Sequence, residues 1–571
     1  MAWDKTSLET QYTNGTLVAV ILDHGVDDED GAELLQECID LHNSARGDIL
    51  NLIDSPSFDD LSGHEFFVAQ RFICRLIPSL EGVSAERMMR YVAKLVAKGG
   101  NDLLANQPNS AFRAWCEVDS KRAEAVIEAA RSDETLAIDH LTFALEATKD
   151  LQIARQIALE FDGQRRLSAL TALSRIPHQD VHTRADTVLA LSSLLDAEPD
   201  DALKAHVLAA AVYPFERAGE ELTPAALALV SRALSDPGEG TVHVAAQVLF
   251  RAKECCSRAL TTLLLDALRW VKPDSRGTLE EIDVGLSHVL KVGQGDLVVD
   301  YLTHVLTKKT DALTMKPFDS LARELAKAHL TLVSNTIVAW LATGKRELCQ
   351  GAEELISEGQ LDNTPLEPAL TSETIADRDV YFTCRKAVGY LFTHPVVAAS
   401  ILISKLRSAN ATLGRMIKDL LFDPLMVNFG GSVRDYLSKI PETDPAFPHA
   451  TELLARAEAY LSGLSTIGVV KELHPSEHRR QLERIRQADF NREVMKKAEK
   501  LSVFHDLVHR SVLLHGSHSV TYVQDADGAR RPVEMKLQHH TMTTEWPRME
   551  TIDPARLDLM LLVFRAEQIK P

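Results

Sequence analysis

The chain has 571 residues, of which 45% are hydrophobic and 25% charged, and it carries a net charge of −20. This length exceeds what a single hydrophobic core usually supports, and the composition excludes a disordered chain. Aromatic residues make up only 6% of the chain, which favours helices over sheets. So large a negative charge disfavours non-specific binding to nucleic acid phosphates.

The seven cysteines form no C-x-x-C pair and show no disulfide-framework spacing, so we expect buried, reduced thiols. The first ten residues, MAWDKTSLET, contain no basic stretch followed by an apolar one. The longest apolar runs, such as 17–22, are far too short to cross a bilayer. These features predict a cytoplasmic protein with no membrane association.

Residues 1–120 are predicted to form an irregular helical region. The stretch 15–25 fits either a short strand or a buried helix, because periodicity cannot decide for so short an apolar run. Ser84 stands in an N-cap position, with an acidic residue in the turn that follows. Three further segments have helical apolar spacing: 28–43, 63–80 and 84–100.

Residues 121–350 contain apolar residues at helical spacing, in segments of about 12–16 residues separated by short polar turns. Four prolines divide the second half of this region into intervals of 36 to 44 residues, each with two predicted helices: Pro199, Pro237, Pro273 and Pro317. HEAT and armadillo units have about this length. One helix pair cannot bury its apolar stripe alone, so successive pairs are expected to stack.

By this period and helix pairing, the chain resembles the HEAT/armadillo class of α-solenoid proteins over about residues 121–420. The resemblance implies a mainly α fold, an irregular α-solenoid of stacked helix pairs. Residues 351–380 are acidic and contain two prolines, which predicts a long loop opening a second helical block over 351–470.

Residues 471–571 differ in composition, with 17 basic and 15 acidic residues. A charged helix is predicted at 475–501, followed by a second helix at 502–515. A strand at 519–524, a turn at 525–531 and a returning strand within 532–546 come next. Asp553 and Pro554 then open an apolar helix. This segment is predicted to be a small α+β appendage.

The stretch His474-Pro475-Ser476-Glu477-His478 matches H-x-x-E-H, the zinc signature of inverted-zincin peptidases. The resemblance implies His474 and His478 as zinc ligands and Glu477 as the general base. However, Pro475 forces the residue before it out of helical geometry, so the two imidazoles are not expected to share a helix face. We interpret the stretch as a helix start and expect no metal or cofactor.

Histidines are nevertheless enriched near the end of the chain, and a zinc site built from His505 and His509 with His515 or His518 is the alternative. Eight of the 21 histidines lie in the last 101 residues. No cysteine occurs there, and no four ligands have a recognisable spacing.

Two basic clusters are candidate contacts for a partner protein or nucleic acid. The first consists of Arg165, Arg166, Arg175 and Arg184, and the second of Arg479, Arg480, Arg484 and Arg486. In the second cluster acidic residues stand at i,i+3 and i,i+4 distances, which is typical of a solvated, self-paired helix face.

No phosphate-binding loop, dinucleotide fingerprint, nucleophile elbow or kinase motif is present in the sequence. We therefore expect a non-enzymatic scaffold or adaptor that binds other proteins. A nucleic-acid-engaging accessory subunit is the alternative, and a zinc-dependent hydrolase comes third.

Overall fold

The computed structural model describes residues 5–24, 29–100, 106–196, 199–369, 376–467, 476–501, 518–524, 530–536 and 545–568. This part of the chain is mainly helical, as the composition predicts. It divides into two compact units. Unit 1 comprises Met1–Thr336 and Gln350–Leu361, and unit 2 comprises Ile337–Cys349 and Asp362–Pro571. The predicted division at 120, 350 and 470 stays a prediction.

The ambiguous stretch at 15–25 is a helix, α2 (Leu17–His24), whose buried residues Leu17, Val18 and Ile21 follow helical spacing. The predicted cap at Ser84 is confirmed, because its side chain accepts a hydrogen bond from the Arg87 amide at 3.3 Å. The other elements before residue 120 are α1 (Lys5–Thr13), α3 (Glu29–Asn43), η1 (Ile49–Asp54), α4 (Pro56–Asp59), α5 (Gly63–Leu76), η2 (Ile77–Ser79), α6 (Ala85–Gly99) and α7 (Gln107–Val118).

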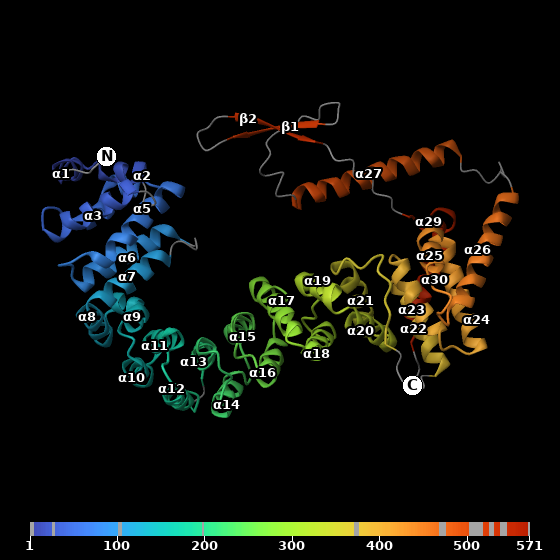
Figure 1. The fold of residues 1–571 in the computed structure, drawn as a ribbon, viewed down its shortest axis with the longest axis horizontal. Helices are drawn as coiled ribbons and strands as arrows, with labels where there is room; N and C mark the ends of the chain where they lie inside the picture. Colours follow the sequence, from blue (N-terminus) through green and yellow to red (C-terminus); the bar gives the residue numbers. More distant parts are fainter. Residues whose placement is uncertain are drawn as a thin grey trace. The chain divides into compact units, whose positions relative to one another are not determined.

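The following helices of unit 1 alternate between two rows (Figure 1). We call the first the odd row: α7, α9 (Thr135–Thr148), α11 (Gly163–Arg175), α13 (Asp201–Ala218), α15 (Glu239–Arg251), α17 (Arg276–Lys291) and α19 (Asp319–Ala328). The even row is α10 (Leu151–Glu160), α12 (Val181–Leu194), α14 (Pro224–Ala233), α16 (Arg258–Leu268) and α18 (Gly295–Leu306). Each helix packs against the next member of its own row, and neighbours along the chain pair across the rows. Helix α8 (Ser120–Arg131) packs against α7 and α9.

The prolines mark the helix pairs as predicted. Pro199, Pro237 and Pro273 lie in the connections before α13, α15 and α17, and Pro317 lies in η4 (Lys316–Phe318) before α19. Each interval between them therefore holds two helices. Alanine and leucine predominate among the buried residues of these helices, because neither is branched at Cβ and both have high helical propensity.

The helices of the odd row are also joined by carboxylates that cap the helix two positions further along the chain. Gly238, the N-cap residue of α15, has no side chain of its own. The carboxylate of Asp201 on α13 accepts hydrogen bonds from the amides of Gly238 at 2.9 Å and Gly240 at 2.7 Å, and from the Thr241 hydroxyl at 2.6 Å. Asp201 thus satisfies amides that the helix start leaves open.

The same arrangement recurs between α17 and α19. The Asp283 carboxylate accepts hydrogen bonds from the amides of Ser320 at 3.2 Å and Leu321 at 2.8 Å. Burial raises the pKa of Asp283, although these hydrogen bonds oppose the rise. We call Asp201 and Asp283 the borrowed caps, since each belongs to one helix pair and caps the next.

The predicted loop at 351–380 is partly wrong, because residues 351–358 belong to α21 (Arg346–Glu358). The acidic residues there fit a helix as well as a loop, and Leu355 and Ile356 are buried. Helices α20 (Leu330–Thr343) and α21 each contain residues of both units. The further helices of unit 2 are α22 (Asp377–Tyr390), α23 (Pro395–Leu406), α24 (Ala411–Leu420), η5 (Leu421–Met426), α25 (Gly430–Ser438) and α26 (Phe447–Ile467).

Where the structure describes the last hundred residues, they combine helices with two paired strands, as predicted. Strands β1 (His518–Gln524) and β2 (Arg530–Lys536) pair antiparallel, with Thr521 opposite Val533. Helix α27 (Glu477–Leu501) precedes them, and the helix predicted at 502–515 lies outside the described residues. Helices α29 (Arg548–Ile552) and α30 (Pro554–Ala566) follow the hairpin.

Helix α30 packs on α22 within unit 2. The predicted cap is confirmed, since the Asp553 side chain accepts from the Arg556 amide at 3.2 Å. The buried Lys386 ammonium donates to the Arg565 carbonyl at 2.6 Å and lies over the ring of Phe382. Burial lowers the pKa of Lys386.

Candidate functional site

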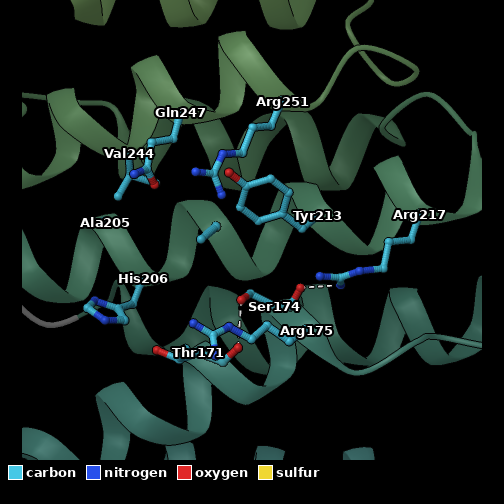
Figure 2. Close-up of a pocket in the computed structure, with 11 residues that line it drawn as sticks. Thr171, Ser174, Arg175, Ala205, His206, Tyr213, Arg217, Val244, Gln247 and Arg251 are labelled. Carbon is cyan, nitrogen blue, oxygen red and sulfur yellow. Dashed lines mark hydrogen bonds between the residues drawn. The ribbon is translucent and has the colours of Figure 1, made fainter. Parts of the chain in front are cut away.

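A pocket of about 390 Å³ opens on the odd row of unit 1, between α11, α13 and α15 (Figure 2). Arg175, Arg217 and Arg251 contribute three guanidinium groups to its wall, one from the last turn of each helix. The other residues that line it are Thr171, Ser174, Ala205, His206, Ala209, Tyr213, Val244 and Gln247. No carboxylate is among the lining residues, although the chain as a whole is strongly acidic. We call this site the arginine pocket.

The guanidinium of Arg175 is partly compensated. Its Nη1 lies 3.0 Å from Oε1 of Glu146 on α9, and Nη1 of Arg113 lies 3.2 Å from Oε2 of the same carboxylate. Glu146 is 7% exposed, so this is one buried carboxylate shared by two arginines. Half of the Arg175 side chain stays exposed and faces the pocket.

Arg217 both binds the end of α11 and lines the pocket. It donates a hydrogen bond to the carbonyl of Ser174, which lies in the last turn of α11 and has no amide partner further along that helix. Burial lowers the pKa of Arg217, the Glu146 carboxylate opposes this, and Arg175 lowers the pKa further. The two guanidinium groups therefore repel each other across the pocket.

Arg251 is exposed at the end of α15, and its side chain extends toward Tyr213 (Figure 2). Burial raises the pKa of Tyr213, although Arg251 opposes the rise, so the phenol is neutral and can donate a hydrogen bond. The Nδ1 atom of His206 is 2.7 Å from the Ala202 carbonyl. Since a carbonyl only accepts, Nδ1 carries the proton and Nε2 is left for a ligand.

The structure separates the four arginines of the first predicted cluster. Arg165 and Arg166 lie in the first turn of α11, where they donate to the carbonyls of Arg131 and Ala158. Arg184 on α12 is 4% exposed and forms an ion pair with Glu220 at 2.7 Å. Arg175 alone lines the arginine pocket.

The second cluster lies along α27. Arg479, Arg480, Arg484 and Arg486 are all exposed there. Arg480 is 3.7 Å from Glu477, one turn away, which fits the predicted self-paired helix face.

His474 and Pro475 of the H-x-x-E-H stretch lie outside the described residues, whereas His478 is exposed on α27. His505, His509 and His515 also lie outside them. Among the residues that the structure does describe, no three His, Cys, Asp or Glu side chains gather as metal ligands would. The zinc site in the histidine-rich segment stays a prediction.

No protein-family model matches the chain, and no curated protein matches it either.

In the described ranges no single helix has the length and apolar character of a membrane span. One helix pair bent by 115°, Lys316–Ala328 with Leu330–Thr343, passes that test by length and composition alone.

Proposed function

We propose that this chain is a non-catalytic scaffold of the α-solenoid type that holds a protein partner on the odd row of unit 1. The observation that carries this proposal is the arginine pocket, which joins side chains from three successive helix pairs into one basic surface. In stacked helix pairs, residues at the same position of each repeat form a continuous face, and such faces commonly bind extended partners.

The chemistry of the pocket supports binding of a partner with an acidic segment. Arg175, Arg217 and Arg251 supply guanidinium groups in a chain whose net charge is −20. A locally positive patch on such a protein discriminates between partners by charge and speeds the encounter with an acidic one.

Photocrosslinking in native extract tests the proposal. A benzoylphenylalanine at Gln247, in the pocket, is compared with one at Thr262, which is exposed on the even-row helix α16. We expect discrete crosslinked species at Gln247 and none at Thr262. Equal labelling at both positions, or a chain that migrates as a free monomer in extract without crosslinks, contradicts a scaffold that binds through the odd row.

The same three arginines also favour a second candidate, a nucleic-acid-engaging accessory subunit. A protein that neutralises several backbone phosphates loses affinity steeply as salt rises. A gel shift with a duplex and a single strand, repeated from 50 to 200 mM salt, separates this function from protein binding.

A further inference from the structure

The carboxylates that act on the arginine pocket are shared between several basic groups and do not line it. Glu146 forms ion pairs with Arg113 and Arg175, and its single charge is therefore already divided between two guanidinium groups. Arg217 is bound to a neutral carbonyl, and the carboxylates that act on Arg217 and Arg251 at longer range, Glu146 and Glu281, are not among the residues that line the pocket.

The pocket wall itself therefore presents three guanidinium groups and no carboxylate, a lining that suits an anion of more than one charge. A phosphate monoester carries about −1.5 to −2 at pH 7 and has three strong acceptor oxygens. One carboxylate, or one phosphodiester of a nucleic acid backbone, has a single charge and only two charged acceptor oxygens, so it matches three guanidinium groups less well.

The donors around the pocket also suit a phosphate group. Guanidinium groups present paired N–H donors that match the spacing of phosphate oxygens. The neutral phenol of Tyr213 adds a hydroxyl donor, and its ring gives the pocket an apolar side. The volume of about 390 Å³ exceeds what a phosphate alone needs, which leaves room for the residues beside it.

We propose that the arginine pocket binds a phosphorylated side chain within a peptide segment of a partner protein. This rests on the proposed scaffold function and adds that the partner is recognised in its phosphorylated form. The phosphate lies between Arg217 and Arg251, and Arg175 closes the site from α11. The adjoining peptide residues contact Val244, Gln247 and His206.

Capture of peptide libraries by the immobilised full-length chain tests the proposal. Three libraries of eleven-residue peptides have a fixed central phosphoserine, serine or glutamate and random flanks. We expect at least about tenfold greater retention of the phosphoserine library, as charge-assisted hydrogen bonds to two arginines imply. Free O-phospho-L-serine and a 15-nucleotide single strand are the competitors.

Substitutions locate the binding. Arg251→Gln should remove most of the phosphoserine preference. Arg276→Gln is the matched control, since Arg276 is also exposed in unit 1 and lies outside the pocket. Tyr213→Phe keeps the ring and should lower retention by a few-fold. The circular dichroism melt of each variant shows that it is folded.

Equal retention of the three libraries, or a preference that survives Arg251→Gln, overturns the proposal. It is also overturned if free O-phospho-L-serine competes at the same concentration as the peptides, which indicates a small-molecule site. Stronger competition by the oligonucleotide supports nucleic acid binding instead. If the libraries bind alike while the crosslinks at Gln247 persist, the scaffold function stands and only the phosphate is refuted.

Discussion

The borrowed cap at the start of α15 allows a test in which one substitution has opposite effects in two backgrounds. A serine at position 238 is a good N-cap residue, and the backbone of Gly238, with φ −83° and ψ −176°, accepts any side chain. In the natural chain, however, the Cβ of a serine would overlap the Asp201 carboxylate. Gly238→Ser should therefore destabilise the natural chain and stabilise the variant Asp201→Ala.

The expected magnitudes follow from the contacts. Asp201→Ala removes four hydrogen bonds from the start of α15, three from amides and one from the Thr241 hydroxyl. Losing a cap costs about 1–2 kcal/mol. We expect the upper end of this range, about 2 kcal/mol, because four hydrogen bonds are lost, and no more than that because the carboxylate is only half-buried. Gly238→Ser should cost about 1–3 kcal/mol in the natural chain through overlap, and should restore about 1 kcal/mol when Asp201 is alanine.

Hydrogen exchange measured by mass spectrometry on peptides covering residues 238–251 reports the local opening of α15. A loss of 2 kcal/mol corresponds to exchange about 30-fold faster. Peptides from α9, which Asp201 does not touch, serve as the internal control. If Gly238→Ser changes exchange equally in both backgrounds, the carboxylate is not the cap and the reasoning is wrong.

Three further predictions concern buried polar groups. Burial, reinforced by nearby arginines, lowers the pKa of His178 to about 4, below the ordinary value of about 6.5, so the unfolded chain binds this proton more readily. Stability should therefore fall by up to about 3 kcal/mol as the pH drops from 6.5 to 4, and His178→Gln should flatten a melting-temperature profile over that range. Lys386→Met removes the hydrogen bond to the Arg565 carbonyl, so exchange of α30 amides should rise about 10- to 100-fold, while an unchanged rate would show that packing alone holds the helix. Burial raises the pKa of the Cys38 and Cys116 thiols to about 12, so DTNB at pH 8 should react with them at least about 100-fold more slowly in the native chain than in urea, and rapid labelling of either would contradict their burial.

Helix pairing in unit 1 could be predicted because local chemistry determines it. Pro199, Pro237 and Pro273 cannot continue a helix, and each stands where an odd-row helix is about to begin. The sequence of 15–25 fits a strand as well as a helix, because the burial of α2 depends on the helices that cover it. Residues 351–358 are acidic enough to suggest a loop, but their few apolar residues, Leu355 and Ile356, are buried and belong to a helix.

The arginine pocket was only partly predictable. Arg175 belongs to a local basic cluster, whereas Arg217 stands alone in its sequence neighbourhood and Arg251 has only Lys253 close to it. They meet because each ends a helix of the odd row, so a search for basic residues recurring at the repeat interval would have found them. Arg184 matches the sequence pattern equally well, but it lies on α12 in the even row, where it is buried and paired with Glu220.

The direction of the borrowed caps has a consequence for how the chain folds during synthesis. Asp201 and Asp283 each precede the helix that they cap, so the carboxylate has already left the ribosome when the next odd-row helix emerges. Helix α25 is the reverse case. The amide of Gly431, at its start, donates a hydrogen bond to the carboxylate of Glu545, which lies 114 residues further along the chain. The caps of α15 and α19 can therefore form as soon as each helix is translated, whereas the start of α25 must wait until Glu545 has been made.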